Sequence, residues 1–340
     1  MSTLRRDPVL GRWVVNTDKL DTNSTTLENL YAPYENGQCP FCQGNEHLTP
    51  PEIFALRPAD TQANTPGWET RVIPNNTPAL NIHGKINRRA DLMYDMMDSI
   101  GAHEIVVGTP EHIPNMADLS EDQFNKIFST YKQRFIDLKR DSRLRCAFAY
   151  KTYGKRAFEE SIPHSHSHII ATPMTPKLIK EQYFGARNYY RYKNRCVYCD
   201  FIRQEVEKEK RLIKSNEKFI AIAPFASRFS HEVWILPREH HCDFEDCSEK
   251  DIPYFSSLVK DILLRIRTLL DDPPYNFALI TGPNRKDRES YWSTIEEDYH
   301  WHLEIMPTFT KTGGFEWATG FYINDTTPEK AAARLREIKL

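Results

Sequence analysis

The chain repeats one series of motifs at a fixed interval, and this repeat constrains its fold more than any other feature of the sequence. Three positions of the first half return 128 residues later: His103 as His231, His112 as His240, and Ser120 as Ser248. Chance does not hold three intervals constant, so the chain is expected to contain two copies of one unit. Within each copy, predicted strands and a helix precede a strand that carries histidines. We therefore expect a duplicated α+β fold.

The histidine-bearing strand of the first copy spans residues 163–172, Pro-His-Ser-His-Ser-His-Ile-Ile-Ala-Thr. Because side chains alternate between the two faces of a strand, His164, His166 and His168 are predicted to lie on one face. A lone histidine is more often a packed or surface residue, but this row puts polar rings where a strand would bury aliphatic side chains. Imidazole titrates near neutral pH, so the row can supply a nucleophile, a proton shuttle and a metal ligand.

The second copy ends in a related strand, Tyr-His-Trp-His-Leu-Glu-Ile over residues 299–305. His302 stands 136 residues after His166, so an insertion has lengthened this interval. Glu304 replaces the third histidine, and bulky residues replace the two serines. We therefore expect His302 to be packed and structural, and the second strand not to form a second active centre.

One amphipathic helix is predicted in each copy. Ser120-Glu-Asp-Gln123 matches a capping box, and Ser248 is expected to open the second helix. The faces expected to be buried follow helical spacing: Phe124, Ile127, Phe128, Tyr131 and Phe135 in the first helix, and Ile252, Phe255, Val259, Ile262, Leu263 and Ile266 in the second.

Other segments are assigned from their composition and from the residues that favour turns. Residues 1–38 are interpreted as an irregular arm with one strand at 12–16, and the Pro- and Thr-rich residues 44–70 as a loop. The small residues of 311–324 are typical of a segment that approaches a ligand or another backbone closely. A last helix is expected after Thr327, with Pro328 in its first turn.

Length and charge limit the classes of protein. The 340 residues allow two ordinary domains, and we place the boundary around 189–194, which gives units 1–190 and 191–340. The net charge is −2, and the 45 basic and 47 acidic side chains are spread along the chain. The sequence therefore contains no basic cluster of the kind that binds nucleic acid or an anionic membrane. No signal core and no run of ~20 apolar residues is present. We expect a soluble, cytoplasmic protein.

Four of the seven cysteines form two Cys-x-x-Cys pairs, which in a reducing compartment indicate metal ligation. Each pair combines with two histidines of its copy into a Cys₂His₂ set: Cys39, Cys42, His112 and His164 in the first, and Cys196, Cys199, His240 and His300 in the second. This is the ligand set of a closed tetrahedral zinc site, so two structural zinc ions per chain are predicted. An isolated pair could be a coincidence or a redox motif, but two pairs in register with histidines make this unlikely.

Two further points concern these thiols and their partners. His241 adjoins His240 and is the alternative ligand, although the repeat favours His240. The remaining cysteines, Cys146, Cys242 and Cys247, are interpreted as ordinary, mostly buried thiols.

Taken together, these motifs resemble the histidine-triad superfamily, and within it the galactose-1-phosphate uridylyltransferase family. The resemblance covers nearly the whole chain. Its parts are the Cys-x-x-Cys pair, the distant histidine, the His-Ser-His-Ser-His strand and the duplication. The segment 313–324, Gly-Gly-Phe-Glu-x-x-Thr-Gly-x-Tyr-Ile-Asn, and the second cysteine pair resemble the two-zinc members, which include plant ADP-glucose phosphorylase. The resemblance implies two histidine-triad-like half-barrels of antiparallel sheet with helices, assembled as a homodimer.

The resemblance also implies a ping-pong reaction on nucleotide-sugar and sugar-phosphate substrates. A nucleoside monophosphate, UMP, would pass between an NDP-sugar and a hexose 1-phosphate through a covalent nucleotidyl-histidine. Matched by position, His166 is the nucleophile, and Ser161 contacts the phosphates. Asn75 and Asn76 contact the ribose, although an Asn-rich turn is the alternative, and Glu316 falls near the family's sugar-binding glutamate. Neutral imidazole suits this role because transfer at phosphorus requires mainly in-line positioning and charge stabilisation.

Two positions depart from the family pattern. His168 stands where the uridylyltransferases have glutamine, and it is expected to donate a hydrogen bond or a proton to the phosphoryl oxygens. Glu159-Glu160 precede Ser161, where the family has small residues, and two carboxylates repel a polyphosphate. The acceptor therefore stays open. A phosphorylase or hydrolase of an NDP-sugar or dinucleotide is the second hypothesis, and a non-catalytic, zinc-stabilised nucleotide-binding protein is the third.

Overall fold

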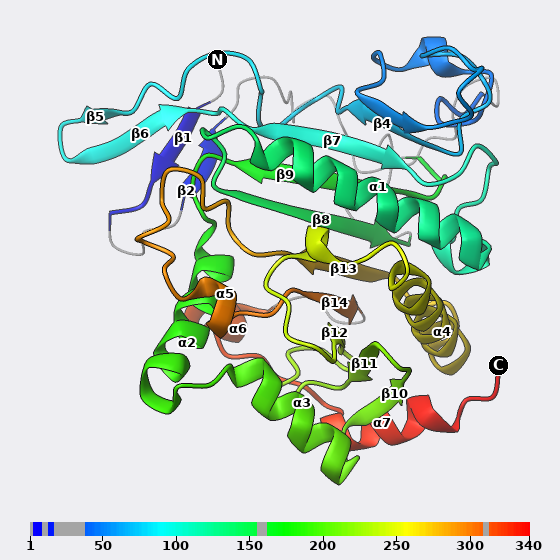
Figure 1. Cartoon of the computed structure of the whole chain (residues 1–340), viewed down its shortest axis with the longest axis vertical. Helices are drawn as coiled ribbons and strands as arrows, with labels where there is room; N and C mark the ends of the chain where they lie inside the picture. The colour runs from blue at the N-terminus through cyan, green and yellow to red at the C-terminus, as the bar shows by residue number, and fades with distance from the viewer. Residues whose placement is uncertain (1–2, 9–12, 17–37, 155–161, 309–312) are drawn as a thin grey trace.

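The computed structural model describes residues 3–8, 13–16, 38–154, 162–308 and 313–340. Its centre is a ten-stranded sheet in which the pairings between described strands are antiparallel (Figure 1). The first half contributes β3 (Phe54–Leu56), β4 (Thr70–Pro74), β7 (Ala102–Val107), β8 (Cys146–Tyr153) and β9 (His166–Thr172). The second half contributes β10 (Leu212–Ser215), β11 (Phe219–Ile222), β12 (Val233–Pro237), β13 (Tyr275–Ile280) and β14 (His302–Pro307).

The order of these strands is mirrored about the middle of the sheet. There β8 pairs with β13, from Tyr153 opposite Tyr275 to Phe148 opposite Ile280. Outward on either side comes the histidine strand, β9 or β14, followed by β7 or β12. Two copies of one unit joined edge to edge produce this arrangement. The predicted duplicated α+β fold with an antiparallel sheet is therefore confirmed.

Two long helices cover one face of the sheet (Figure 1). α1 (Glu121–Lys139) and α4 (Ile252–Leu270) pack together, with the rings of Phe128 and Phe255 4.6 Å apart. Alternate residues of β9, among them Ile169 and Ala171, point into this core. Because strand side chains alternate, the histidines of β9 belong to the opposite face.

The opposite face is covered over the second half by shorter helices. These are α2 (Lys177–Lys193), α3 (Val197–Lys208) and α5 (Ile295–Asp298), and they enclose a second apolar cluster with Ile220, Leu236 and Ile280. α6 (Gly314–Thr319) and α7 (Pro328–Glu337) complete the described helices, besides short 3-10 turns at Glu46–Leu48, Met116–Asp118 and Phe244–Asp246. A separate four-stranded sheet has the order β2 (Trp13–Asn16), β1 (Thr3–Arg6), β6 (Tyr94–Asp98) and β5 (Arg89–Asp91).

The two predicted amphipathic helices are present, and one begins later than expected. The Ser120 side chain accepts a hydrogen bond from the backbone N–H of Gln123 and caps α1 as predicted. In α4 the N-cap is Asp251, so the expectation that Ser248 opens this helix is wrong. Ser248 Oγ instead accepts from the backbone N–H of Asp251 in the turn before the helix, and Pro253 occupies the first turn, where a missing N–H costs nothing.

Two further expectations need correction. The amino-terminal arm contains β1 as well as β2, because β1 pairs with both β2 and β6. The expected loop 44–70 contains β3. The boundary predicted at 189–194 falls at the end of α2, whose C-cap Asn194 has a left-handed φ of 53°, and the division into units 1–190 and 191–340 stays a prediction. The last helix, α7, begins at Pro328 with Thr327 as its N-cap, as predicted.

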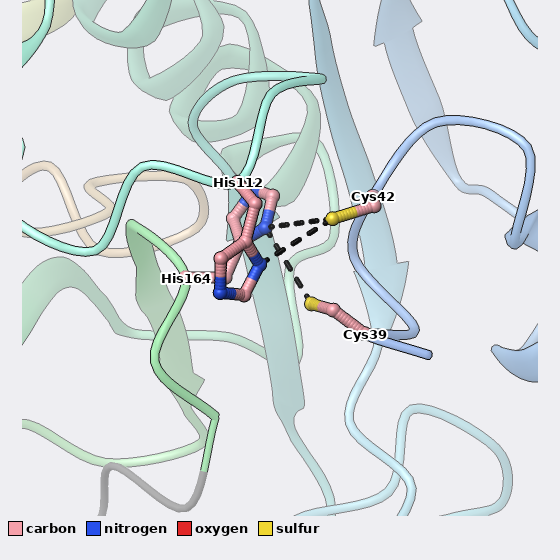
Figure 2. A group of neighbouring side chains, drawn as sticks. All are labelled: Cys39, Cys42, His112 and His164. Carbon is pink, nitrogen blue, oxygen red and sulfur yellow. Dashed lines mark hydrogen bonds between the residues drawn. The ribbon is translucent and has the colours of Figure 1, made fainter. Parts of the chain in front are cut away.

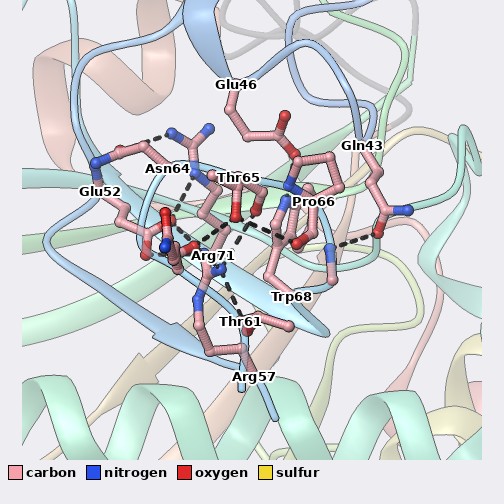
Figure 3. Close-up of polar contacts among 12 residues, drawn as sticks. Gln43, Glu46, Glu52, Arg57, Thr61, Asn64, Thr65, Pro66, Trp68 and Arg71 are labelled. Atoms are coloured by element: carbon pink, nitrogen blue, oxygen red, sulfur yellow. Dashed lines mark hydrogen bonds and ion pairs between the residues drawn. The ribbon is translucent and has the colours of Figure 1, made fainter. Parts of the chain in front are cut away.

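The segment between the first cysteine pair and β4 is held by buried polar contacts (Figure 3). Arg71, which is 1% exposed, donates to Glu52 at 3.2 Å, and Arg57 donates to the same carboxylate at 2.6 Å. The Trp68 indole N–H donates to buried Glu46 at 2.7 Å. These charged hydrogen bonds, beside the small apolar cluster of Phe41, Trp68 and Ile73, hold the segment in place. They form between residues far apart in the segment, so its composition alone suggested a loop. Across the described helices, none combines the length and apolar character that a membrane span requires.

Candidate active site

The first predicted Cys₂His₂ set comes together at one point (Figure 2). Cys42 Sγ lies 3.4 Å from His112 Nδ1 and 3.7 Å from His164 Nδ1, and Cys39 Sγ lies 3.6 Å from His164 Nδ1. In a tetrahedral zinc site the sulfur and nitrogen ligands are about 3.5 Å apart, given the usual bond lengths. The chemistry and spacing of the donors thus fit a single tetrahedral metal ion.

The second set, Cys196, Cys199, His240 and His300, is arranged in the same way. Cys199 Sγ lies 3.3 Å from His240 Nδ1, and Cys196 Sγ lies 3.5 Å from His300 Nδ1. His240 is therefore the histidine that joins the cluster, and His241 lies outside it. The prediction that each Cys₂His₂ set comes together into a group able to hold a metal ion is confirmed.

Backbone carbonyls orient the histidines of both clusters. The Nε2–H groups of His164, His240 and His300 donate to the carbonyls of Thr109, Glu296 and Glu239 at 2.9, 2.7 and 3.0 Å. With the proton held on Nε2, each Nδ1 keeps its lone pair toward the thiolates. Such hydrogen bonds fix the tautomer that a metal requires. The other three cysteines, Cys146, Cys242 and Cys247, are buried and lie apart from both clusters, as expected.

His166 is the first residue of β9 and is buried between the metal cluster and His168. Its Nδ1–H donates to the backbone carbonyl of His164 at 2.7 Å, which leaves the lone pair on Nε2. Phe41, between the two cysteines of the first pair, packs edge-on against the ring at 5.1 Å. Burial, and then the neighbouring Lys151 ammonium, lower the pKa of His166 to about 3, so the ring is neutral at pH 7.

His168 lies on the same face and contacts a histidine that the sequence analysis used only as a marker of the repeat. His168 Nδ1 is 3.2 Å from His103 Nε2, and His103 Nε2 is 3.0 Å from Asn75 Nδ2. Tyr150, the cross-strand partner of His168 on β8, stacks on its ring at 4.9 Å. Burial lowers the pKa of His103 to about 4 and, together with the charges of its neighbours, that of His168 to about 2.

The remaining predicted site residues are placed as follows. Asn75 follows β4 and joins the His103–His168 pair, whereas Asn76 is exposed. Ser161, with Glu159 and Glu160, lies outside the described residues. Glu316 lies in α6, where its carboxylate accepts from the backbone N–H of Gly313 at 2.9 Å. Within the described chain, Glu316 is therefore not brought to the histidine row.

The second histidine strand repeats the backbone contact of the first, but the ring of its histidine is enclosed by neighbouring side chains. His302 Nδ1 lies 3.2 Å from the carbonyl of His300, as His166 does from that of His164. The other ring nitrogen of His302 contacts Glu304 at 3.2 Å, Trp234 stacks on the ring at 5.1 Å, and Arg228 pairs with Glu304. His302 is fully buried, so the position is packed and ion-paired.

Comparisons with known proteins agree with this geometry. No protein-family model matches the chain. An ADP-glucose phosphorylase of Arabidopsis thaliana is 30% identical over 342 residues, which cover 99% of this chain and 93% of that protein. A galactose-1-phosphate uridylyltransferase of Thermotoga maritima is 26% identical over 347 residues, covering 100% and 99%.

Solved structures give the same result. The crystal structure of an Arabidopsis thaliana ADP-glucose phosphorylase with bound ADP-glucose has a TM-score of 0.77 at 28% identity, with 100% of each chain covered. A uridylyltransferase structure has a TM-score of 0.79 at 23% identity, covering 99% of this chain and 97% of that one, which supports the fold.

The duplicated fold with its two Cys₂His₂ clusters and its row of buried histidines, together with these relatives, identifies an enzyme of the nucleotidyltransferase class. Within that class, the chain belongs to the galactose-1-phosphate uridylyltransferase family. The family resemblance stated from the motifs is thereby confirmed.

Proposed function

We propose that this enzyme transfers UMP between a UDP-sugar and a hexose 1-phosphate through a nucleotidyl-His166 intermediate. The observation that carries the proposal is the hydrogen bond from His166 Nδ1–H to the His164 carbonyl, because it leaves the Nε2 lone pair for attack. Nε2 bonds to the α-phosphorus while the bond to the bridging oxygen breaks, and the hexose 1-phosphate leaves with that electron pair. In the second half-reaction, a phosphate oxygen of the acceptor attacks and the P–N bond breaks.

Other residues of the chain take roles around this step. Burial keeps His166 neutral, so it is a nucleophile without prior loss of a proton. His168 lies 5.4 Å from His166 between ring centres, and this short distance supports its proposed role as a hydrogen-bond donor to the phosphoryl oxygens. Asn75, which contacts His103 at 3.0 Å, is proposed to position the ribose, together with Asn76 and with Ser161 at the phosphates.

Zinc is the metal that we propose for both clusters, because two thiolates and two imidazoles are its preferred tetrahedral ligands. With four protein ligands at each site, the ion supplies folding free energy and no open coordination position. His164 belongs both to the cluster, through Nδ1, and to the nucleophile, through its carbonyl. The first cluster therefore positions His166 without touching the substrate.

A second candidate function is an ADP-glucose phosphorylase, in which inorganic phosphate is the acceptor. The 30% identical relative from Arabidopsis thaliana and the solved structure with bound ADP-glucose favour it. The chemistry at His166 is unchanged, since phosphate offers the same attacking oxygen as a sugar phosphate.

The deciding experiment compares two donor and acceptor pairs. Purified protein is incubated with UDP-glucose plus galactose 1-phosphate, or with ADP-glucose plus phosphate, and products are separated by anion exchange. Turnover of the first pair supports the proposed function, and turnover of the second alone supports the phosphorylase. If neither pair reacts and intact-mass analysis finds no nucleotide on the chain with either donor, both proposed reactions are excluded.

The enzyme is also proposed to act as a homodimer in the cytoplasm, where thiols stay reduced and able to bind metal. The exposed apolar segment of α6 and the residues after it support the dimer, because Trp317 is 77% exposed and Phe321 68%. Glu316 lies in this segment. For Glu316 to contact the sugar, this exposed segment must reach the active site when two chains assemble.

A further inference from the structure

A large cavity lies at the far end of β9 from the catalytic histidine. Its volume is ≈ 680 Å³, and it is lined by the small sheet, by the residues after β9 and by α2. Figure 1 shows the small sheet and α2 toward the same end of the central sheet. From His166 to Thr172 the strand spans about 20 Å, and neither the metal ligands nor the catalytic histidines line the cavity. The cavity is therefore separate from the candidate active site.

The lining carries an excess of positive charge. Seven cationic side chains and two acidic ones face it: Arg6, Arg88, Arg89, Arg145, Lys177, Lys180 and Arg288 against Asp95 and Glu181. Asp95 is paired with Arg6, Glu181 with Lys177, and Arg89 with Asp98 outside the lining. Among the described residues this leaves Arg88, Arg145, Lys180 and Arg288 without a carboxylate partner within 4.0 Å. Uncompensated charges in a concave site attract anions.

Arg145 is the centre of this group. Its Nη1 donates to the backbone carbonyl of Lys286 at 2.8 Å, while its Nε is buried without a hydrogen-bond partner. Burial, and then the charge of Arg288, lower the pKa of Arg145, with Arg88 acting in the same direction and Asp287 opposing it. The charge of Asp287 therefore offsets only part of the repulsion among these cations, and a bound anion would relieve the rest.

The start of α2 points to the same ligand chemistry. Pro176 is its N-cap and provides no side-chain hydrogen bond, and the first turn contains no acidic residue. Lysines stand in that turn instead, against the usual preference for negative charge at a helix N-terminus. Tyr291, 43% exposed, and Trp13 supply aromatic surface to the cavity wall.

We infer that this cavity binds an oligophosphate anion, either inorganic or as the diphosphate of a nucleotide. Arg145, Arg288 and Arg88 pair with the phosphate oxygens, as guanidinium groups do by two parallel hydrogen bonds. The free N–H groups at the start of α2 add to the attraction. A cavity of this size accommodates a nucleoside diphosphate, whose base stacks on Tyr291.

The test counts ligands on the full-length protein. Pyrophosphate and ADP are titrated calorimetrically, and bound radiolabelled ADP per chain is measured by equilibrium dialysis. Arg145→Gln/Arg288→Gln is expected to bind one ADP per chain fewer than the parent protein. The matched variant Arg191→Gln/Lys193→Gln, at the other end of α2, is expected to bind as many ADP per chain as the parent. Because Arg145 also supports the fold, the exposed Arg88→Gln is measured too, with an expected loss of about tenfold in pyrophosphate affinity at this site.

The outcomes distinguish this site from the active site. His166→Ala is expected to keep the ADP bound in this cavity, so failure of the proposed reaction leaves this inference intact. Tighter binding of ADP than of pyrophosphate identifies a nucleotide as the ligand, and equal binding identifies the oligophosphate group alone. The same number of ADP per chain in Arg145→Gln/Arg288→Gln as in the parent, together with unchanged pyrophosphate affinity in Arg88→Gln, overturns the inference.

Discussion

His103 Nε2 and His168 Nδ1 lie 3.2 Å apart on the same face of the sheet, so one proton is shared between the two imidazoles. The strand register explains the contact, because Ile105 stands opposite His168 and His103 opposite Ile170, which makes the two histidines diagonal neighbours. Both rings are neutral near pH 7, since their pKa values are lowered to about 4 and about 2. His103 thereby sets the tautomer and orientation of His168.

Substitution of His168 tests its role beside the nucleophile. His168→Gln keeps a hydrogen-bond donor, so the covalent adduct on His166 is expected to form in this variant. A longer-lived adduct in His168→Gln means that His168 promotes hydrolysis, and this favours transfer to water or phosphate. The adduct is followed by intact-mass analysis after addition and removal of the donor. If its lifetime and pH profile match those of the parent, His168 has no part in the chemistry.

His103→Ala removes the partner of His168 without touching the nucleophile. We expect adduct formation to slow by about 10²-fold, because His168 loses its fixed tautomer. His83→Ala, an exposed histidine on a neighbouring loop, is the control and is expected to react normally. In the parent, formation of the adduct is expected to be flat from pH 6 to 8, since protonation of His103 and His168 lies below that window. A sigmoid step in that range would show that one of them titrates there.

His166→Ala is expected to abolish the covalent nucleotide and to lower turnover by at least ~10⁴-fold. His302→Ala serves as the comparison, since His302 has the same backbone contact but is enclosed by Glu304 and Trp234. That variant is expected to lose stability and to retain labelling. If labelling disappeared in His302→Ala and persisted in His166→Ala, the nucleophile would be His302 and not His166.

Much of the site could be predicted from the sequence because the repeat showed which positions of the two copies are equivalent. Two cysteine pairs at equivalent positions indicated which histidines complete each cluster, and the structure brings those ligands together. His103 was missed as a site residue because its partner is 65 residues away, and only strand pairing places it there. The ion pair of Arg228 with Glu304 was missed for the same reason, since the two are separated by 76 residues.

The helix α2 was not predicted from the sequence, for a different reason. Its buried residues, Ile179, Tyr183, Ala186 and Arg187, follow helical spacing, but Lys, Arg, Tyr, Asn and Gly make up most of the rest of the segment. That composition is typical of a linker as much as of a helix. The tertiary contacts of Tyr183 decide the outcome: its ring packs against Tyr299 at 4.7 Å and its hydroxyl donates to the carbonyl of Thr281.

Removal of one thiolate from either cluster tests the metal assignment. The parent is expected to contain two zinc ions per chain by elemental analysis without chelators. Cys39→Ser and Cys196→Ser are each expected to contain one and to lose about 3–5 kcal/mol of unfolding free energy. Cys146→Ser is the matched control, because Cys146 is a buried thiol outside both clusters. Two zinc ions retained in Cys39→Ser would exclude this cysteine as a ligand.

The ion pair of buried Glu304 with the partly exposed Arg228 predicts a pH dependence of stability. Its hydrogen bond to His302 and the charges of His302 and Arg228 hold the pKa of Glu304 at about 2, against 4.5 when it is unpaired. Because the pKa is lower in the folded state, the stabilisation is present above about pH 4.5 and is lost as the pH falls toward 2. Its size is about 3 kcal/mol.

Urea unfolding between pH 3 and 7 measures this contribution. Glu304→Gln is expected to be less stable at pH 7 and to show a shallower fall in acid than the parent. Glu329→Gln, which removes the more exposed partner of Arg211, is the control and is expected to change the slope little. Parallel pH curves for the parent and Glu304→Gln would contradict the assignment.

Substitution of Trp317 tests the proposed dimer, because Trp317 is the most exposed aromatic residue of α6. A tryptophan buried at an interface contributes about 2–4 kcal/mol to the free energy of association. Trp317→Asp is therefore expected to raise the dimer dissociation constant by at least about 30-fold, as measured by analytical ultracentrifugation over a range of concentrations. Tyr192→Asp changes an aromatic residue that is 82% exposed on α2, so it serves as the control and is expected to leave the dimer intact. If Glu316 reaches the sugar only in the assembled protein, Trp317→Asp also raises the KM for the donor at low protein concentration, and a higher concentration restores it. A parent chain that sediments as a monomer at micromolar concentration would rule out the dimer.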